Sequence, residues 1–260
     1  KPSSPLVLYS PGWGATRLQS RVQVANLASH GFVVVGCDDI ANDVENDPER
    51  GLGLELATDA DAAESIARAG RHAVQQGKRL LEILAALGAG QVAAVAGRLD
   101  LSHVGVLGYS IGDGGLFGPA PDGIVVDKYF LLSSREAFPS AQELASPDPF
   151  TRNYARISAM DIPRNTQRMA QPRSYWAMIP SVGHGDLSDG LFARAGWRPG
   201  RTNFERAAVN RAIEGLQVAF FRSALLGDDG PLQSLLGRDD QTVRWISPTS
   251  PSAGAAKARQ

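Results

Sequence analysis

The most informative part of this sequence is the stretch His103-Val-Gly-Val-Leu-Gly-Tyr-Ser-Ile-Gly112, in which an apolar run leads directly into a Gly-x-Ser-x-Gly pentapeptide. In a nucleophile elbow a strand turns sharply into a helix and exposes a serine hydroxyl. Small residues two positions before and after that serine let the backbone turn without collision. Gly108 and Gly112 take these positions around Ser110. Since the chain has 28 glycines, an ordinary glycine-rich turn is the alternative interpretation.

Around this stretch, short apolar runs alternate with helical patterns, which predicts an α/β fold with a mainly parallel sheet and helices on both of its faces. We expect strands at residues 6–9, 32–37, 104–107, 128–132 and 175–179. We expect helices at about residues 16–29, 59–87 and 203–226, the second with a break near Gly70 or Gly77. Asp38 and Asp39 open an acidic loop after a predicted strand, and we interpret them as solvated or capping carboxylates.

Length and composition favour a single domain over residues 1–246, because 260 residues with 43% hydrophobic content and no internal linker suffice for one large core. Within this domain, residues 137–173 are a candidate cap or lid. After it, residues 247–260 form a Pro/Ser/Ala-rich tail.

The formal net charge of the chain is −1, so the chain does not have the large excess of charge of one sign that is typical of a nucleic-acid binder. We expect a small-molecule or polymeric partner, no nucleic acid and no stable membrane insertion, since no run of 18 apolar residues occurs.

A serine nucleophile needs a general base, and the chain offers four histidines. His30, His72 and His103 have ordinary explanations, at a helix end, within a helical pattern and at a strand start. His184 differs because its Gly-His-Gly loop follows the apolar run 175–180. Such a loop reaches back over the carboxyl edge of a sheet, where an elbow serine points. His184 is therefore the predicted base, and an exposed loop histidine is the alternative.

An oxyanion hole needs two backbone N–H donors, one from the residue after the nucleophile and one from the loop after an early strand. Ile111 supplies the first. The stretch Tyr9-Ser-Pro-Gly-Trp-Gly14 supplies the second at Trp13, which two glycines flank. We expect Trp13 to form a wall of the acyl site, with Tyr109 as a further substrate contact. A purely structural role of Trp13 in the core is the alternative.

These motifs resemble the α/β-hydrolase superfamily, in the branch of platelet-activating-factor acetylhydrolase-like esterases and bacterial lipases and cutinases. The resemblance covers most of the chain and rests on residues 10–14, 27–35, 101–112 and 183–189. Pro11 departs from the family, which usually has His there. The resemblance implies a serine carboxylic-ester hydrolase that works through an acyl-enzyme without a cofactor or a metal. It implies short-chain acyl esters, phospholipid acetyl esters or polyesters as substrates.

The resemblance also implies the acid of a Ser-His-Asp triad. The family carries an Asp-Gly-x-Leu-x-Gly-Pro motif whose Asp orients the base, and residues 113–119 of this chain, Asp-Gly-Gly-Leu-Phe-Gly-Pro, match it. Asp113 is therefore the predicted acid. Glu136, in the turn after the predicted strand 128–132, and Asp127, just before that strand, are the alternatives.

The position of Asp113 directly after Gly112 conflicts with a complete elbow. A crossover between parallel strands needs a dozen residues or more, and Gly112-Asp-Gly-Gly is a poor start for a helix. We therefore expect that a crossover unit, a helix plus a strand of roughly 20 to 30 residues, is missing from the sequence after Gly112. A true deletion would favour an alternative function, an inactive hydrolase-fold binding module. A dienelactone-hydrolase-like lactonase or amidase is the other alternative, although that family typically has Cys where Ser110 stands.

The single cysteine, Cys37, excludes an intrachain disulfide but does not indicate in which cellular compartment the protein works. Spacing typical of a zinc site is absent. The sequence starts at Lys1-Pro2 without an initiator Met, which suggests a processed N-terminus. Together with the family resemblance, this start favours a secreted or periplasmic enzyme, with the cytoplasm as the alternative.

Overall fold

A computed structural model describes residues 3–12, 14–39, 62–109, 112, 126–132, 154–158, 174–178, 203–236, 238 and 244–245. For residues 62–74 and 203–204 and for the last four strands of the sheet, the description covers the backbone alone.

The described strands form one sheet in the order β2-β1-β3-β4-β5-β6-β7. Neighbouring strands from β2 to β6 are parallel, and β7 pairs with β6 in the antiparallel sense. The strands are β1 (Ser4–Ser10), β2 (Val33–Gly36), β3 (Leu99–Tyr109), β4 (Val126–Leu132), β5 (Tyr154–Ser158), β6 (Ser174–Met178) and β7 (Arg244–Trp245). This arrangement confirms the α/β class and the mainly parallel sheet.

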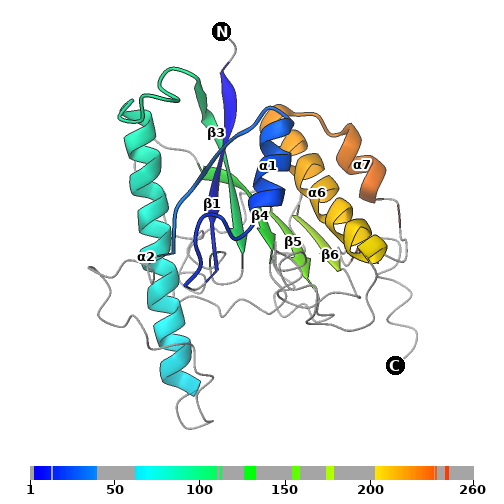
Figure 1. Ribbon diagram of the computed structural model, residues 1–260, viewed down its shortest axis with the longest axis horizontal. Coiled ribbons are helices and arrows are strands. Elements are labelled where there is room, and N and C mark those ends of the chain that lie inside the picture. The colour runs from blue at the N-terminus through cyan, green and yellow to red at the C-terminus, as the bar shows by residue number, and fades with distance from the viewer. Residues whose placement is uncertain are drawn as a thin grey trace.

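The described helices cover both faces of the sheet. They are α1 (Arg21–Ser29), α2 (Ala62–Gly88), α6 (Asn203–Leu226) and α7 (Gly230–Leu236). Figure 1 shows α2 along one side of the sheet, and α1, α6 and α7 together on the other. The layers follow from the crossover helices that parallel strands require.

Alternate residues of the strands point to opposite faces and build two cores. On the face of α6, Val7, Tyr9 and Leu107 pack against Phe220 and Phe221, together with α1 and α7. On the face of α2, the next residues along the same strands pack against this helix; they are Leu6, Leu8, Val104 and Val106 from the sheet and Leu80, Leu84 and Leu87 from α2. The central strands β1 and β3 are therefore buried on both sides.

The structure differs from the sequence prediction in the helices. Helix 203–226 has the predicted bounds, but α2 runs without a break through Gly70 and Gly77. Helix α1 begins at Arg21 rather than near residue 16, because the preceding residues are bonded to other loops. The backbone N–H of Arg17 donates to the Asp38 carboxylate at 2.8 Å, and the Gln19 side chain accepts from Gly12 N at 2.8 Å.

The predicted cap or lid at residues 137–173 is wrong for its central part. Residues 154–158 form β5, which pairs with β4 on one side and β6 on the other. A strand between two others in a sheet cannot also fold over that sheet as a lid. The remainder of the segment and the tail 247–260 lie outside the described residues.

The crossover unit that we expected to be missing after Gly112 would follow β3 in the sequence. Residues 113–125 lie outside the described residues, so this expectation stays a prediction. β3 and β4 are direct neighbours, with Gly108 opposite Leu131 and Tyr109 opposite Leu132. The connection between them, residues 110–125, is longer than the dozen residues that a parallel crossover requires.

Candidate functional site

The carboxyl ends of the parallel strands meet at one edge of the sheet, which is where α/β proteins bind ligands. Ser10 at the end of β1 lies opposite Gly108 of β3, and β3 ends at Tyr109, the residue before Ser110. Ser110 and Ile111 lie outside the described residues. The chain therefore enters the predicted elbow at the ligand-binding edge.

Gly112 packs directly against the backbone of the loop that follows β1. A Cβ atom at Gly112 would lie 2.5 Å from the carbonyl oxygen of Ser10 and closer still to that of Pro11. Because both obstacles are backbone atoms, no side chain fits at this position. The second glycine of the Gly-x-Ser-x-Gly pentapeptide is thus required by a close approach between the elbow and the β1 loop.

The β1 loop continues into a tight turn from Gly12 to Ala15. The N–H of Ala15 donates to the carbonyl oxygen of Gly12 at 3.0 Å, and Gly14 has a positive φ of 64°, which glycine adopts without strain. The N–H of Gly12 donates to the side-chain oxygen of Gln19 at 2.8 Å. The N–H of Gly14 donates to the carboxylate of Asp39 at 3.0 Å.

The two carboxylates after β2 have different surroundings. Asp39 is fully buried, and besides its side-chain bond its own N–H donates to the carbonyl oxygen of Ala15 at 2.9 Å. Of the two roles that we expected for Asp39, the solvated one is therefore wrong, and its bond from the Gly14 N–H is in keeping with the capping one. Asp38 is partly exposed and forms an ion pair with Arg17 at 3.2 Å, in keeping with a capping role.

Helix α2 contributes Gln76 to the same edge. The side-chain amide of Gln76 donates to the Ser10 hydroxyl at 3.5 Å and to the Cys37 sulfur at 3.3 Å, and all three residues are buried. Burial raises the pKa of the Cys37 thiol to about 11, although the positive charge of Arg79 and the bond from Gln76 partly oppose this shift. Cys37 is therefore protonated near neutral pH and is no candidate nucleophile.

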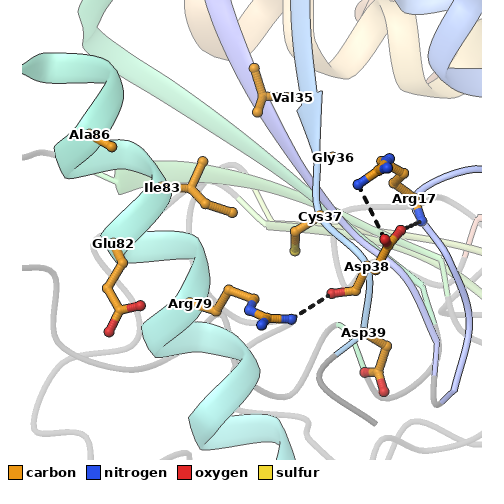
Figure 2. Close-up of a pocket in the computed structure, with 10 residues that line it drawn as sticks. All are labelled: Arg17, Val35, Gly36, Cys37, Asp38, Asp39, Arg79, Glu82, Ile83 and Ala86. Carbon is orange, nitrogen blue, oxygen red and sulfur yellow. Dashed lines mark hydrogen bonds and ion pairs between the residues drawn. The ribbon is translucent and has the colours of Figure 1, made fainter. Parts of the chain in front are cut away.

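A pocket of about 720 Å³ opens between the end of β2 and helix α2, as Figure 2 shows. Its apolar side consists of Val35, Ile83 and Ala86, and its polar side is lined by Arg17, Cys37, Asp38, Asp39, Arg79 and Glu82. Its volume lies within the range of about 300–1,000 Å³ that is typical of small-molecule sites. In this pocket the Arg79 guanidinium donates to the backbone oxygen of Asp38 at 3.3 Å.

The structure describes two of the predicted site residues. The side chain of Tyr109 is only 3% exposed and belongs to the core on the α6 face, which does not favour a substrate contact. The backbone of Asp127 lies inside β4, near its amino end. The others lie outside the described residues and stay predictions; they are Trp13, Ser110, Ile111, Asp113, Glu136 and His184.

Sequence reasoning missed three side chains that organise this edge. Gln19 and Gln76 lie in polar helical patterns that carry no signal for a loop contact. Asp39 had a usable signal, because a carboxylate three residues after the last residue of a parallel strand is close to the carboxyl edge of the sheet, where α/β proteins bind ligands.

The comparison with solved structures shows a likeness over nearly the whole chain. A ferulic acid esterase from Streptomyces cinnamoneus matches 94% of this chain and 74% of its own length, with a TM-score of 0.64 and 21% sequence identity. The chain shares the fold of that esterase. No protein-family model and no curated protein matches the sequence. At this level of identity the likeness concerns the fold alone.

Two features are absent from the described part of the chain. No described helix is long and apolar enough to cross a membrane. Within the same part of the chain, no group of three or more His, Cys, Asp or Glu side chains is arranged to hold a metal ion.

Proposed function

We propose that this protein is a serine hydrolase of carboxylic esters, with Ser110 as its nucleophile. The packing of Gly112 against the Ser10–Pro11 backbone carries the proposal. It brings the residue two positions after Ser110 against the loop that contains Trp13, and acyl transfer needs a nucleophile and an oxyanion donor from two such segments. The fold shared with an esterase adds support.

In the proposed reaction the Ser110 hydroxyl attacks the ester carbonyl while His184 accepts its proton. The N–H groups of Trp13 and Ile111 stabilise the negative charge on the carbonyl oxygen. His184 then returns the proton to the departing alcohol, which leaves an acyl group on Ser110. Water, deprotonated by His184, attacks this acyl-enzyme and releases the acid.

The acid that orients His184 is Asp113 in this proposal. The position of Asp127 near the amino end of β4 argues against it, since five residues of strand, roughly 16 Å, separate it from the carboxyl edge. Glu136 follows the carboxyl end of β4 in the sequence and stays the alternative. His184 follows β6, which runs parallel to β5 and therefore leads toward the same edge.

The proposed substrates are esters of uncharged acyl groups, including short-chain acyl esters, phospholipid acetyl esters and polyesters. Because the structural neighbour is a ferulic acid esterase, we add hydroxycinnamoyl esters to this set. A Trp13 wall suits flat or apolar acyl groups through stacking and burial.

The test is turnover of p-nitrophenyl acetate, p-nitrophenyl butyrate and methyl ferulate by the parent chain and by Ser110→Ala. Loss of the hydroxyl should reduce kcat by at least about 10³-fold, because no acyl-enzyme forms. Ser102→Ala, at the other end of β3, is the matched control and should retain parent activity. Equal turnover by the parent and Ser110→Ala would refute the role of Ser110. No turnover above background by the parent chain would favour the inactive binding module.

A further inference from the structure

The turn of residues 12–15 is attached at both sides of Trp13 by side chains from elsewhere in the chain. Before Trp13, the N–H of Gly12 donates to Gln19 at 2.8 Å. After Trp13, the N–H of Gly14 donates to the buried carboxylate of Asp39 at 3.0 Å. Because both N–H groups already have side-chain acceptors, neither Gly12 nor Gly14 is available to stabilise an oxyanion.

Asp39 holds the turn through two bonds of different kinds. Its carboxylate accepts from Gly14, and its backbone N–H donates to the Ala15 oxygen at 2.9 Å. Asp39 is itself fixed, since it lies three residues beyond Gly36, the last residue of β2, and Gly36 pairs with Tyr9 of β1. The chain that leads to Asp39 is therefore anchored to the sheet, and the N–H of Cys37 also donates to the carbonyl oxygen of Tyr9 at 3.4 Å.

We propose that Asp39 and Gln19 are positioning residues of the oxyanion hole, which orient the turn of residues 12–15 so that the N–H of Trp13 faces the reacting carbonyl oxygen. The inference rests on the proposed ester-hydrolase function. An oxyanion hole is effective only when its donors are oriented before the reaction begins. A fixed acceptor on each neighbour of Trp13 provides that orientation, because it fixes the peptide planes on either side.

Two pairs of variants test this inference, and each pair separates the loss of the acceptor from a milder change. Asp39→Ala and Gln19→Ala remove the acceptor oxygen. Asp39→Asn and Gln19→Glu keep an oxygen acceptor of nearly the same shape. Asp38→Ala is the matched control, because Asp38 bonds Arg17 rather than the turn of residues 12–15.

We expect each alanine variant to lose about 10- to 100-fold in kcat with p-nitrophenyl acetate, the scale of loss when a catalytic group is displaced by about 1 Å. KM should change by less than about threefold, because the affected interaction forms in the transition state. Asp39→Asn and Gln19→Glu should recover most of this loss. Affinity for a trifluoromethyl ketone, whose adduct with Ser110 carries an oxyanion, should fall in parallel with kcat.

A purely structural role of Asp39 and Gln19 gives different results. Leu225→Ala, which weakens the core on the α6 face, serves as a stability control, with kcat measured per folded molecule well below every melting temperature. Parent-like kcat in both alanine variants would overturn the inference, as would losses that Asn and Glu fail to rescue. A parent chain whose turnover does not depend on Ser110 would instead refute the proposed function, so the two failures are distinguishable.

Discussion

Gly112 and Gly105 lie at positions where a side chain would collide with other atoms, for two different reasons. At Gly112 the neighbours are backbone oxygens of the β1 loop, and the contact lies at the candidate site. At Gly105, inside β3, a Cβ atom would lie 2.7 Å from the ring of Phe221, and the contact lies in the core. Neither glycine is among those with positive φ. Both positions therefore depend on tertiary contacts. The Gly-x-Ser-x-Gly pattern marks Gly112 in the sequence, whereas no local pattern marks Gly105.

Gly112→Ala should damage activity more than stability. The added methyl group pushes the Ser10–Pro11 backbone away, and a displacement of about 1 Å at a catalytic loop costs about 100-fold in kcat/KM. The overpacking should lower the free energy of unfolding by about 1–3 kcal/mol. Ester hydrolysis and thermal unfolding of the same preparation measure both effects.

Gly215→Ala is the matched control for this substitution. Gly215 lies inside α6, and a Cβ atom there would meet no other atom within 4 Å. Alanine should stabilise the helix by about 0.5–1 kcal/mol and leave activity unchanged. Parent-like hydrolysis by Gly112→Ala would contradict the role that we give to the elbow contact.

Helix α6 is the main cover of one face of the sheet. Phe220 and Phe221 are both buried, and their rings meet edge to face with centroids 5.4 Å apart. Phe221 also contacts Phe32, just before β2, with centroids 6.1 Å apart. Val7 and Tyr9 of β1 belong to the same core, so these contacts join α6 to the sheet.

Phe221→Ala should destabilise the fold strongly. Removing the ring leaves a cavity over Gly105 and should lower the free energy of unfolding by about 3–5 kcal/mol, as measured by urea denaturation. Leu226→Ala, on the same helix, is the control, because Leu226 is 52% exposed and its loss should cost no more than about 0.5 kcal/mol. Similar losses in the two variants would show that the α6 core is not packed as described.

In the molecule as a whole, the parallel sheet brings together segments that are far apart in the sequence. The ends of β1 and β3 lie side by side, and α2 reaches the same edge through Gln76. The edge thus combines residues near positions 10, 37, 76 and 112. A parallel topology produces this convergence because every strand from β1 to β6 ends at the same side.

Burial of Cys37 predicts that the stability of the whole chain falls in alkali. Its thiol pKa rises from 9.0 to about 11 on folding. Below pH 9 the thiol is protonated in both states and the pKa shift has no effect. Between pH 9 and 11 the unfolded chain loses the proton first, which favours unfolding. We expect about 2 kcal/mol of stability to be lost by pH 11, since one pKa unit corresponds to about 1.36 kcal/mol.

Comparison with Cys37→Ala isolates this contribution from other groups that titrate in alkali. The difference in the free energy of unfolding between parent and variant should shift by about 2 kcal/mol between pH 8 and pH 11. A difference that stays constant over this range would show that the thiol ionises equally in the folded and unfolded chain.

The fold was predictable from the sequence to a large extent, and the candidate site less so. Helix 203–226 has both predicted ends, because its apolar pattern is long and Gly227, with a φ of 70°, follows directly. β5 was not predicted, since Tyr154–Ser158 contains Arg156 and shows no clear alternation. Its place in the sheet depends on β4 and β6 as pairing partners. The role of Gln19 was hidden, because it is defined by a bond to Gly12. For Asp39 the sequence indicated a place near the edge of the sheet but not the bond to Gly14.

By itself, the sequence determined the α/β class, the order of the main elements and the Gly-x-Ser-x-Gly stretch that suggests acyl transfer. Periodicity and local turn chemistry lie within short windows of the chain, so they can be read without a structure. Only the tertiary structure decided that Gly112 touches the Ser10–Pro11 backbone and that the turn of residues 12–15 is held by Gln19 and Asp39. The Gly112 and Asp39 contacts join residues far apart in the chain, and only the parallel sheet brings them together.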